Sequence, residues 1–162
     1  MATTDDYRTG KIVEGIRKAE ALLGSRSAIA DGDSAFERIR EKILGFRPVW
    51  ITRNETVGLI GDARIIAVGE RVCRALHPES PETQSVFLDE LAEAMVEAGR
   101  AVFVTTEEVE LIIVRQQRQK FIASLVSGKY LELCAVHPPD CFFCKAERAG
   151  IRCFERNTDS PD

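Results

Sequence analysis

The chain has 162 residues, with 22 Lys and Arg against 26 Asp and Glu, which gives a net charge of −4 with both histidines neutral. This length fits one domain, and 44% hydrophobic with 30% charged residues is typical of a soluble globular protein. No apolar run approaches the ~20 residues of a membrane span. The polar segment 1–10 lacks the pattern of a secretory signal, so we expect a cytoplasmic protein without membrane contact.

The first third of the chain predicts two helices. Apolar residues recur at helical spacing over residues 5–23, and Gly24 suits the position after a helix end. A capping-box pattern formed by Ser34 and Glu37 predicts a second, short helix that ends at about Leu44. We therefore expect this part of the chain to be helical.

Residues 49–77 have two interpretations. Thr52 and Glu55 form a capping pattern, and Pro78 would stop a long helix, so we favour a helix here. The alternative is an α+β protein with short strands within residues 47–69, because this segment is rich in β-branched residues and its glycines disfavour a helix.

The second half predicts two further helices, over residues 82–98 and from Thr105 to about Ser127, joined by an extended segment at 101–104. The expected fold is therefore all-α, a small helical bundle of about five helices with a C-terminal cysteine-rich loop. The expected organisation is a helical domain over 1–133, a cysteine-rich metal or cluster loop over 134–155 and a disordered tail over 156–162.

Cysteines carry the chemistry of this sequence. Cys73 stands among apolar residues and is interpreted as a small core residue. The other four lie in the last 29 residues, in the pattern C-x6-C-x2-C-x8-C. An odd count in a cytoplasmic chain favours metal or redox chemistry over a disulfide framework. The candidate ligands are Cys134, Cys141, Cys144 and Cys153.

Two kinds of metal centre fit this pattern. Four thiolates suit an iron–sulfur cluster of the [4Fe-4S] type, which we favour, or an all-thiolate zinc site as the alternative. A second zinc set would use His137 in place of Cys153, within a segment that Pro138 and Pro139 stiffen. A metal would supply the free energy that orders a loop too small for its own core.

The pattern Cys134-x6-Cys141-x2-Cys144 resembles the iron–sulfur cluster loop of helix-hairpin-helix DNA glycosylases of the endonuclease III type. The resemblance is confined to residues 134–153, and the last spacer is longer than in that family. It implies a 4Fe-4S cluster but not glycosylase activity, because the hairpin and catalytic residues of the family are absent from this sequence.

Two further hypotheses concern partners and activity. The main hypothesis is a binding or redox module that works with an unidentified protein partner and contacts nucleic acid through basic side chains near the cysteines. An alternative is an enzyme: Arg71-x5-His77 resembles the Arg-x4–6-His pattern of the all-helical HEPN ribonucleases. The candidate nucleic-acid contacts are Arg115, Arg118, Lys120, Lys129 and Lys145.

Overall fold

A computed structural model describes residues 1–25, 34–81, 84–115 and 120–155. Within these residues the fold is mixed α/β, so the expectation of an all-α bundle is wrong. The helices are α1 (Thr4–Thr9), α2 (Lys11–Gly24), α3 (Ser34–Gly45), α4 (Arg53–Asp62), α5 (Val72–Leu76), α6 (Asp89–Glu97), α7 (Thr106–Arg115) and α8 (Phe142–Arg148). The strands are β1 (Val49–Ile51), β2 (Ile66–Glu70), β3 (Gln84–Leu88), β4 (Ala101–Phe103), β5 (Lys120–Val126) and β6 (Lys129–Val136).

The six strands form one antiparallel sheet in the order β1-β5-β6-β3-β2-β4. A tight hairpin joins β5 and β6 at its centre, where Ser127 and Gly128 both have positive φ, at 51° and 80°. Two consecutive residues of this kind match the right-handed twist of paired strands. The hairpin thus places β6 in the middle of the sheet, with β3 on its other side.

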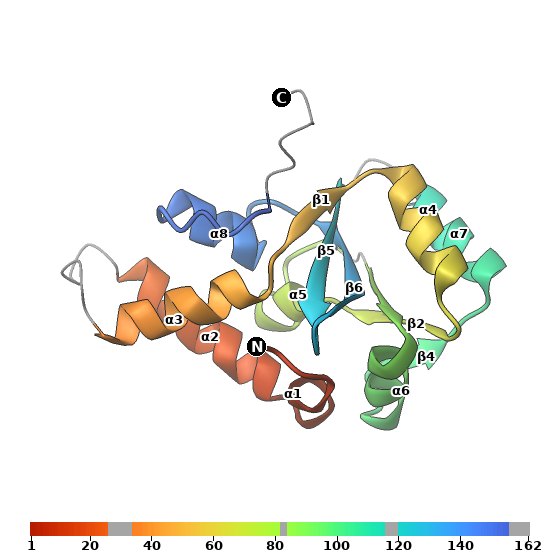
Figure 1. Ribbon diagram of the computed structural model, residues 1–162, viewed down its shortest axis with the longest axis horizontal. Helices are drawn as coiled ribbons and strands as arrows, with labels where there is room; N and C mark the ends of the chain where they lie inside the picture. The colour runs from red at the N-terminus through yellow and green to blue at the C-terminus, as the bar shows by residue number, and fades with distance from the viewer. Residues whose placement is uncertain (26–33, 82–83, 116–119, 156–162) are drawn as a thin grey trace.

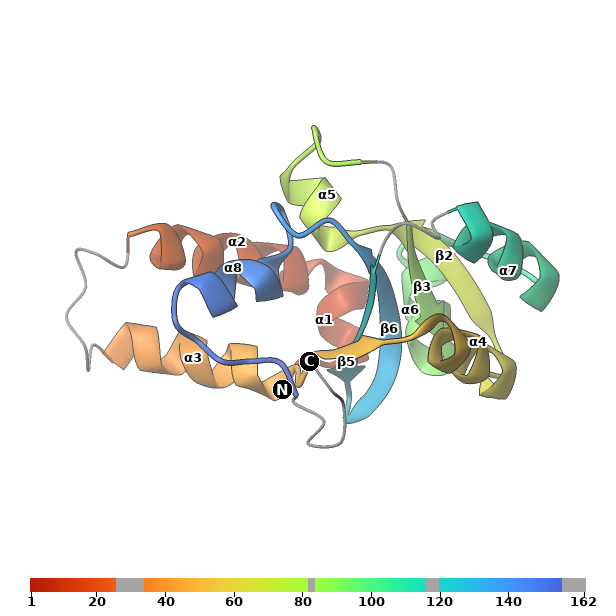
Figure 2. The same cartoon turned by 90° about the horizontal axis from the view of Figure 1, so that it is seen from above.

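Helices lie on both sides of the sheet. Figures 1 and 2 show α2, α3 and α8 gathered at one end of the molecule, whereas α4 and α7 lie together at the other end. The short helix α5 contacts α2, and α8 contacts α2 as well. Among the described helices, none is both long enough and apolar enough to cross a membrane.

Three helix predictions are wrong in part. Residues 49–77 form β1, α4, β2 and α5 rather than one helix. The alternative prediction of short strands within residues 47–69 was correct for β1 and β2 but not for the segment that forms α4. Residues 82–98 begin with strand β3, and the helix predicted to end near Ser127 gives way to β5.

The physical reason for these errors is burial on both faces of the central strands. Strand β3 is buried from Ser85 to Leu88, and β5 from Phe121 to Ser124. A strand covered on both faces shows a continuous apolar run instead of alternation, and such a run cannot be distinguished from a buried helix by its periodicity.

Two capping signals in the sequence are confirmed by the structure. Thr52 and Glu55 form the predicted capping box at α4, with backbone-to-side-chain hydrogen bonds of 3.1 and 3.2 Å. Thr105 and Glu108 make the same reciprocal pair at α7. The first predicted helix is divided into α1 and α2 at Gly10, whose φ is 81°. The predicted tail, 156–162, lies outside the described residues.

Candidate metal centre

The cysteines come from three parts of the fold that lie side by side. Cys134 belongs to the central strand β6, so it is part of the sheet rather than of a terminal loop. Cys141 is the residue that caps the N-terminus of α8, and Cys144 lies one turn into that helix. Cys73 lies in α5, just after the buried Arg71.

A tight turn brings α8 back towards β6. The backbone N–H groups of Asp140 and Cys141 donate to the carbonyl of His137, at 3.0 and 2.9 Å. The imidazole Nδ1 of His137 also lies 2.6 Å from the carboxylate of Asp140. His137, the alternative zinc ligand, is thus hydrogen bonded within the turn.

A cavity of about 40 Å³ lies between β6, α5 and α8. Three thiol-bearing residues line it: Cys73, Cys134 and Cys141. Its volume is enough for a few water molecules. The remaining lining residues are Tyr7, Ile16, Phe46, Arg71, Val72, Ile122, Ser124, Glu132, Val136, Phe142 and Phe143.

The thiols are electrostatically coupled. Burial raises the pKa of Cys73 to about 12, and the neighbouring Cys141 adds to this shift. Burial also raises the pKa of Cys134, with contributions from Cys73 and Cys141. The hydrogen bond between Cys141 and Cys144 raises the pKa of Cys141 and lowers that of Cys144. Cys73, Cys134 and Cys141 thus favour the neutral thiol, and a bound cation would favour their thiolate forms.

Cys153 does not line this cavity, although it is close enough to Cys141 and Cys144 to interact with them electrostatically. The chain reverses at Gly150, where φ is 92°, and returns along α8. The Cys153 thiol donates to the carbonyl of Phe143 at 3.6 Å, and only 5% of the residue is exposed. Burial raises its pKa to about 12, with Glu147 as the second cause. Cys73, interpreted from the sequence as a core residue, lines the cavity, whereas Cys153, a predicted ligand, does not.

The spacing of the sulfurs bears on the kind of metal. In a tetrahedral zinc site with Zn–S bonds of ~2.3 Å, thiolate sulfurs lie ~3.8 Å apart. In the described part of the chain, which includes all five cysteines, no three sulfurs lie within 4.8 Å of one another. A four-iron cluster needs a wider arrangement, since each thiolate binds a different iron.

Beside the cysteines, Tyr7 and Glu132 form a buried pair. The phenolic O–H of Tyr7 donates to the Glu132 carboxylate at 2.5 Å, and Tyr7 is 2% exposed. The Ser85 hydroxyl is a more distant second donor, at 3.5 Å. Burial raises the pKa of Glu132 and of Tyr7, and the nearby Glu132 is the second cause for Tyr7. This pair ties α1 to the strand that carries Cys134.

We expect Tyr7→Phe to destabilise the protein by about 1–3 kcal/mol, because it leaves the buried Glu132 without its main donor. Urea denaturation followed by circular dichroism measures the loss. The matched control is Tyr7→Phe in a Glu132→Gln background, where a neutral amide replaces the carboxylate and the loss should be smaller. An equal loss in both backgrounds would show that the hydrogen bond is not the cause.

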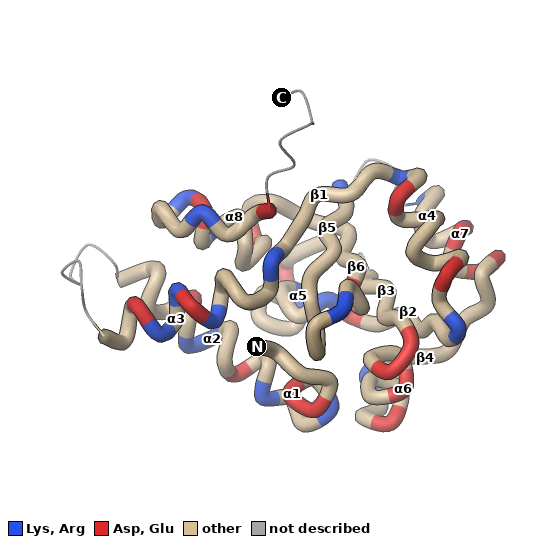
Figure 3. The backbone as a smooth tube through the Cα atoms, viewed as in Figure 1, with Lys and Arg blue, Asp and Glu red and all other residues tan. Residues whose placement is uncertain are grey.

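The candidate nucleic-acid contacts do not form one surface. Lys120 and Lys129 stand at opposite ends of the β5–β6 hairpin, and Figure 3 shows basic and acidic segments mixed over the fold. Lys129 pairs with Glu90 at 3.0 Å and Lys145 with Glu20 at 3.2 Å. Lys120 lies 5.7 Å from the Trp50 ring centre, Arg115 is an exposed residue at the end of α7, and Arg118 lies outside the described residues.

Arg71 and His77 face different surroundings. The Arg71 guanidinium is buried and donates to the Ser80 hydroxyl and to the Pro81 carbonyl, at 2.8 and 2.9 Å. His77 pairs with Glu20 at the surface of α2. With a six-stranded sheet in place of an all-helical fold, these contacts give the ribonuclease hypothesis no support.

Comparisons with protein-family models, curated proteins and solved structures found no match to this chain.

Proposed function

We propose that this protein is a metal-binding module that holds a 4Fe-4S cluster through cysteine thiolates and acts in binding or electron transfer. The observation that carries the proposal is the convergence of thiols from β6, α5 and α8 on one cavity. Cys73 is 61 positions from Cys134, so their meeting is a product of the fold and not of a short local motif.

The structure favours Cys73, Cys134, Cys141 and Cys144 as the ligand set. Cys73, Cys134 and Cys141 line the cavity, and Cys144 is hydrogen bonded to Cys141. Arg71 also lines the cavity, and its charge lowers the pKa of Cys73 and Cys134 against the larger opposite effect of burial. A fixed cation suits a cluster with four thiolates, because such a centre carries net negative charge.

A cluster would fill more than the present cavity. A volume of about 40 Å³ holds a few water molecules, whereas the cluster core has eight heavy atoms. Its binding therefore requires α8 to move away from β6. The preceding turn at 137–141 is the segment that would allow this, because α8 is short and packs mainly on α2.

Zinc is the second candidate, because the same thiolates would bind it after closing to a tighter arrangement. With four protein ligands, either metal would have no open position for a substrate. The centre would then stabilise the fold or transfer electrons rather than catalyse a reaction.

The test is anaerobic purification followed by metal analysis and a visible spectrum. We expect a brown protein with about four irons and four acid-labile sulfides per chain and broad absorption near ~400 nm. A colourless protein with one zinc per chain would show that the centre holds zinc and not a cluster. A protein that binds neither metal after reconstitution with iron and sulfide would contradict the proposal.

A further inference from the structure

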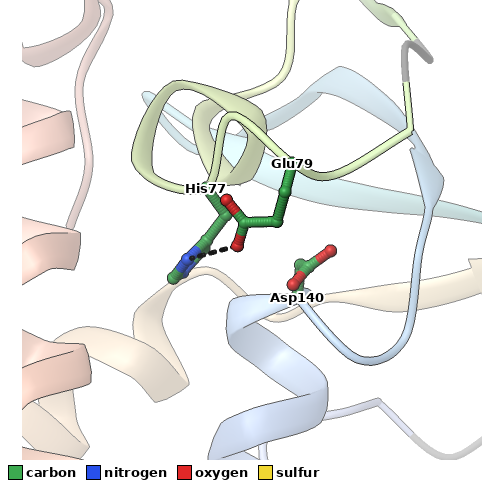
Figure 4. A group of neighbouring side chains, drawn as sticks. All are labelled: His77, Glu79 and Asp140. Carbon is green, nitrogen blue, oxygen red and sulfur yellow. Dashed lines mark ion pairs between the residues drawn. The ribbon is translucent and has the colours of Figure 1, made fainter.

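A second group of metal-binding side chains lies outside the cysteine cavity. His77 and Glu79 follow α5, and Asp140 precedes α8 (Figure 4). Each offers a ligand atom within 4.8 Å of the other two. The imidazole Nδ1 of His77 lies 3.7 Å from the Glu79 carboxylate, a spacing that one shared metal ion would span with bonds of ~2.0–2.2 Å. We propose that His77, Glu79 and Asp140 bind a divalent first-row transition-metal ion.

The contacts of the His77 ring support this proposal. Its Nε2 atom lies 2.9 Å from the Glu20 carboxylate on α2. When Nε2–H donates to this carboxylate, Nδ1 keeps its lone pair on the side of Glu79. A carboxylate that fixes the imidazole tautomer in this way is the usual outer partner of a metal-bound histidine. Glu20 is therefore the positioning residue of the site.

Lys145 completes the surroundings of Glu20. Its ammonium lies 3.2 Å from the second carboxylate oxygen of Glu20 and 3.0 Å from Nε2 of His77. An ammonium can only donate, so a metal ion at Nδ1 selects the tautomer with the proton on Nε2, and Lys145 is then hydrogen bonded to Glu20 alone. The lysine charge is thereby matched by Glu20. Glu79 and Asp140 then supply the two negative charges that balance a divalent cation.

Asp140 is prepared as a ligand by its own neighbours. The Nδ1 atom of His137 lies 2.6 Å from the Asp140 carboxylate and fixes its orientation ahead of α8. The Glu79 side chain is 74% exposed and the His77 side chain 26% exposed, so the site is open to solvent on one side.

The ligand chemistry separates this site from the cysteines. One imidazole and two carboxylates suit Mn²⁺, Fe²⁺ or Zn²⁺, whereas thiolates select softer centres. Three protein ligands leave coordination positions for water, and a bound water of this kind becomes more acidic. The site thus has the open coordination that the cysteine centre lacks.

The test is a titration of the full chain with Mn²⁺, in which electron paramagnetic resonance counts the free ion. We expect saturable binding of one Mn²⁺ per chain. Glu79→Gln, which changes an exposed side chain, should weaken binding at least ~10-fold, and Glu20→Gln should weaken it ~10–100-fold through the tautomer of His77. His77→Ala should abolish binding.

Two controls keep the result specific. Glu41→Gln removes an exposed carboxylate from α3 and should leave Mn²⁺ affinity unchanged. Cys144→Ser, compared with the wild type as iron-free protein so that the turn at 137–141 has the geometry described here, should also leave Mn²⁺ affinity unchanged, because Cys144 is not a ligand of this site. Non-saturable binding, or equal affinity for Glu79→Gln and Glu41→Gln, would overturn the proposal.

Discussion

Replacement of Cys73 by Ser is expected to remove most of the iron and the visible absorption, whereas Cys153→Ser should retain both. Cys73 lines the cavity together with Cys134 and Cys141, but the Cys153 thiol donates to the carbonyl of Phe143. A hydroxyl is a poor replacement for a thiolate ligand, and the two substitutions are the same chemical change at buried or half-buried positions. The pair therefore separates ligand loss from general effects of Cys→Ser.

The measurement is iron and sulfide content after anaerobic reconstitution, with circular dichroism as a check that each variant is folded. Loss of iron in Cys153→Ser with retention in Cys73→Ser would instead support the ligand set Cys134, Cys141, Cys144 and Cys153. Retention in both variants would exclude both four-cysteine sets. Cys141→Ser, which lies in either set, is the positive control and should lose the cluster.

Gly69→Ala is expected to destabilise the protein by about 3 kcal/mol or more. Gly69 pairs with Ala101 in the β2–β4 ladder, and a Cβ atom at this position would lie 2.3 Å from the carbonyl oxygen of Arg100. Such an overlap with backbone cannot be relieved by a side-chain rotation, so β4 must move away from β2. Forced repacking of a well-packed interior costs typically ~1–3 kcal/mol, and disruption of strand pairing adds to this.

Gly58→Ala is the matched control for this substitution. Gly58 lies on the exposed face of α4, where an added Cβ would meet no atom within 4 Å. Alanine in a helix interior is favoured over glycine, so we expect a gain of about 0.5–1 kcal/mol. Urea denaturation measures both variants. A Gly69→Ala protein as stable as the wild type would contradict the close approach of β2 and β4.

Local hydrogen bonds made part of the fold predictable from the sequence. The capping box of α4 joins Thr52 to Glu55, three residues away, and that of α7 joins Thr105 to Glu108. The short edge strand β4 matched the extended segment predicted at 101–104. Such signals need no distant partner, so they can be read before the fold is known.

The central strands could not be assigned in the same way. Strands β3 and β5 are apolar because they are covered on both faces, and only pairing with β6 decides that these runs are strands. The turn at Ser127 and Gly128 was interpreted as a helix end because glycine is common at both places. Tertiary contacts thus overrode the helical spacing of the sequence.

The candidate sites were likewise predictable from the sequence only in part. The sequence by itself indicated thiol chemistry, because four cysteines fall within 20 consecutive residues. The odd cysteine count was the only hint that Cys73 could be a ligand. No feature of the sequence indicated a site that joins His77 to Asp140 across 62 intervening residues. Only the packing of α5 and α8 against β6 and α2 brings these side chains together, because metal ligands are selected by distance in space and not by spacing along the chain.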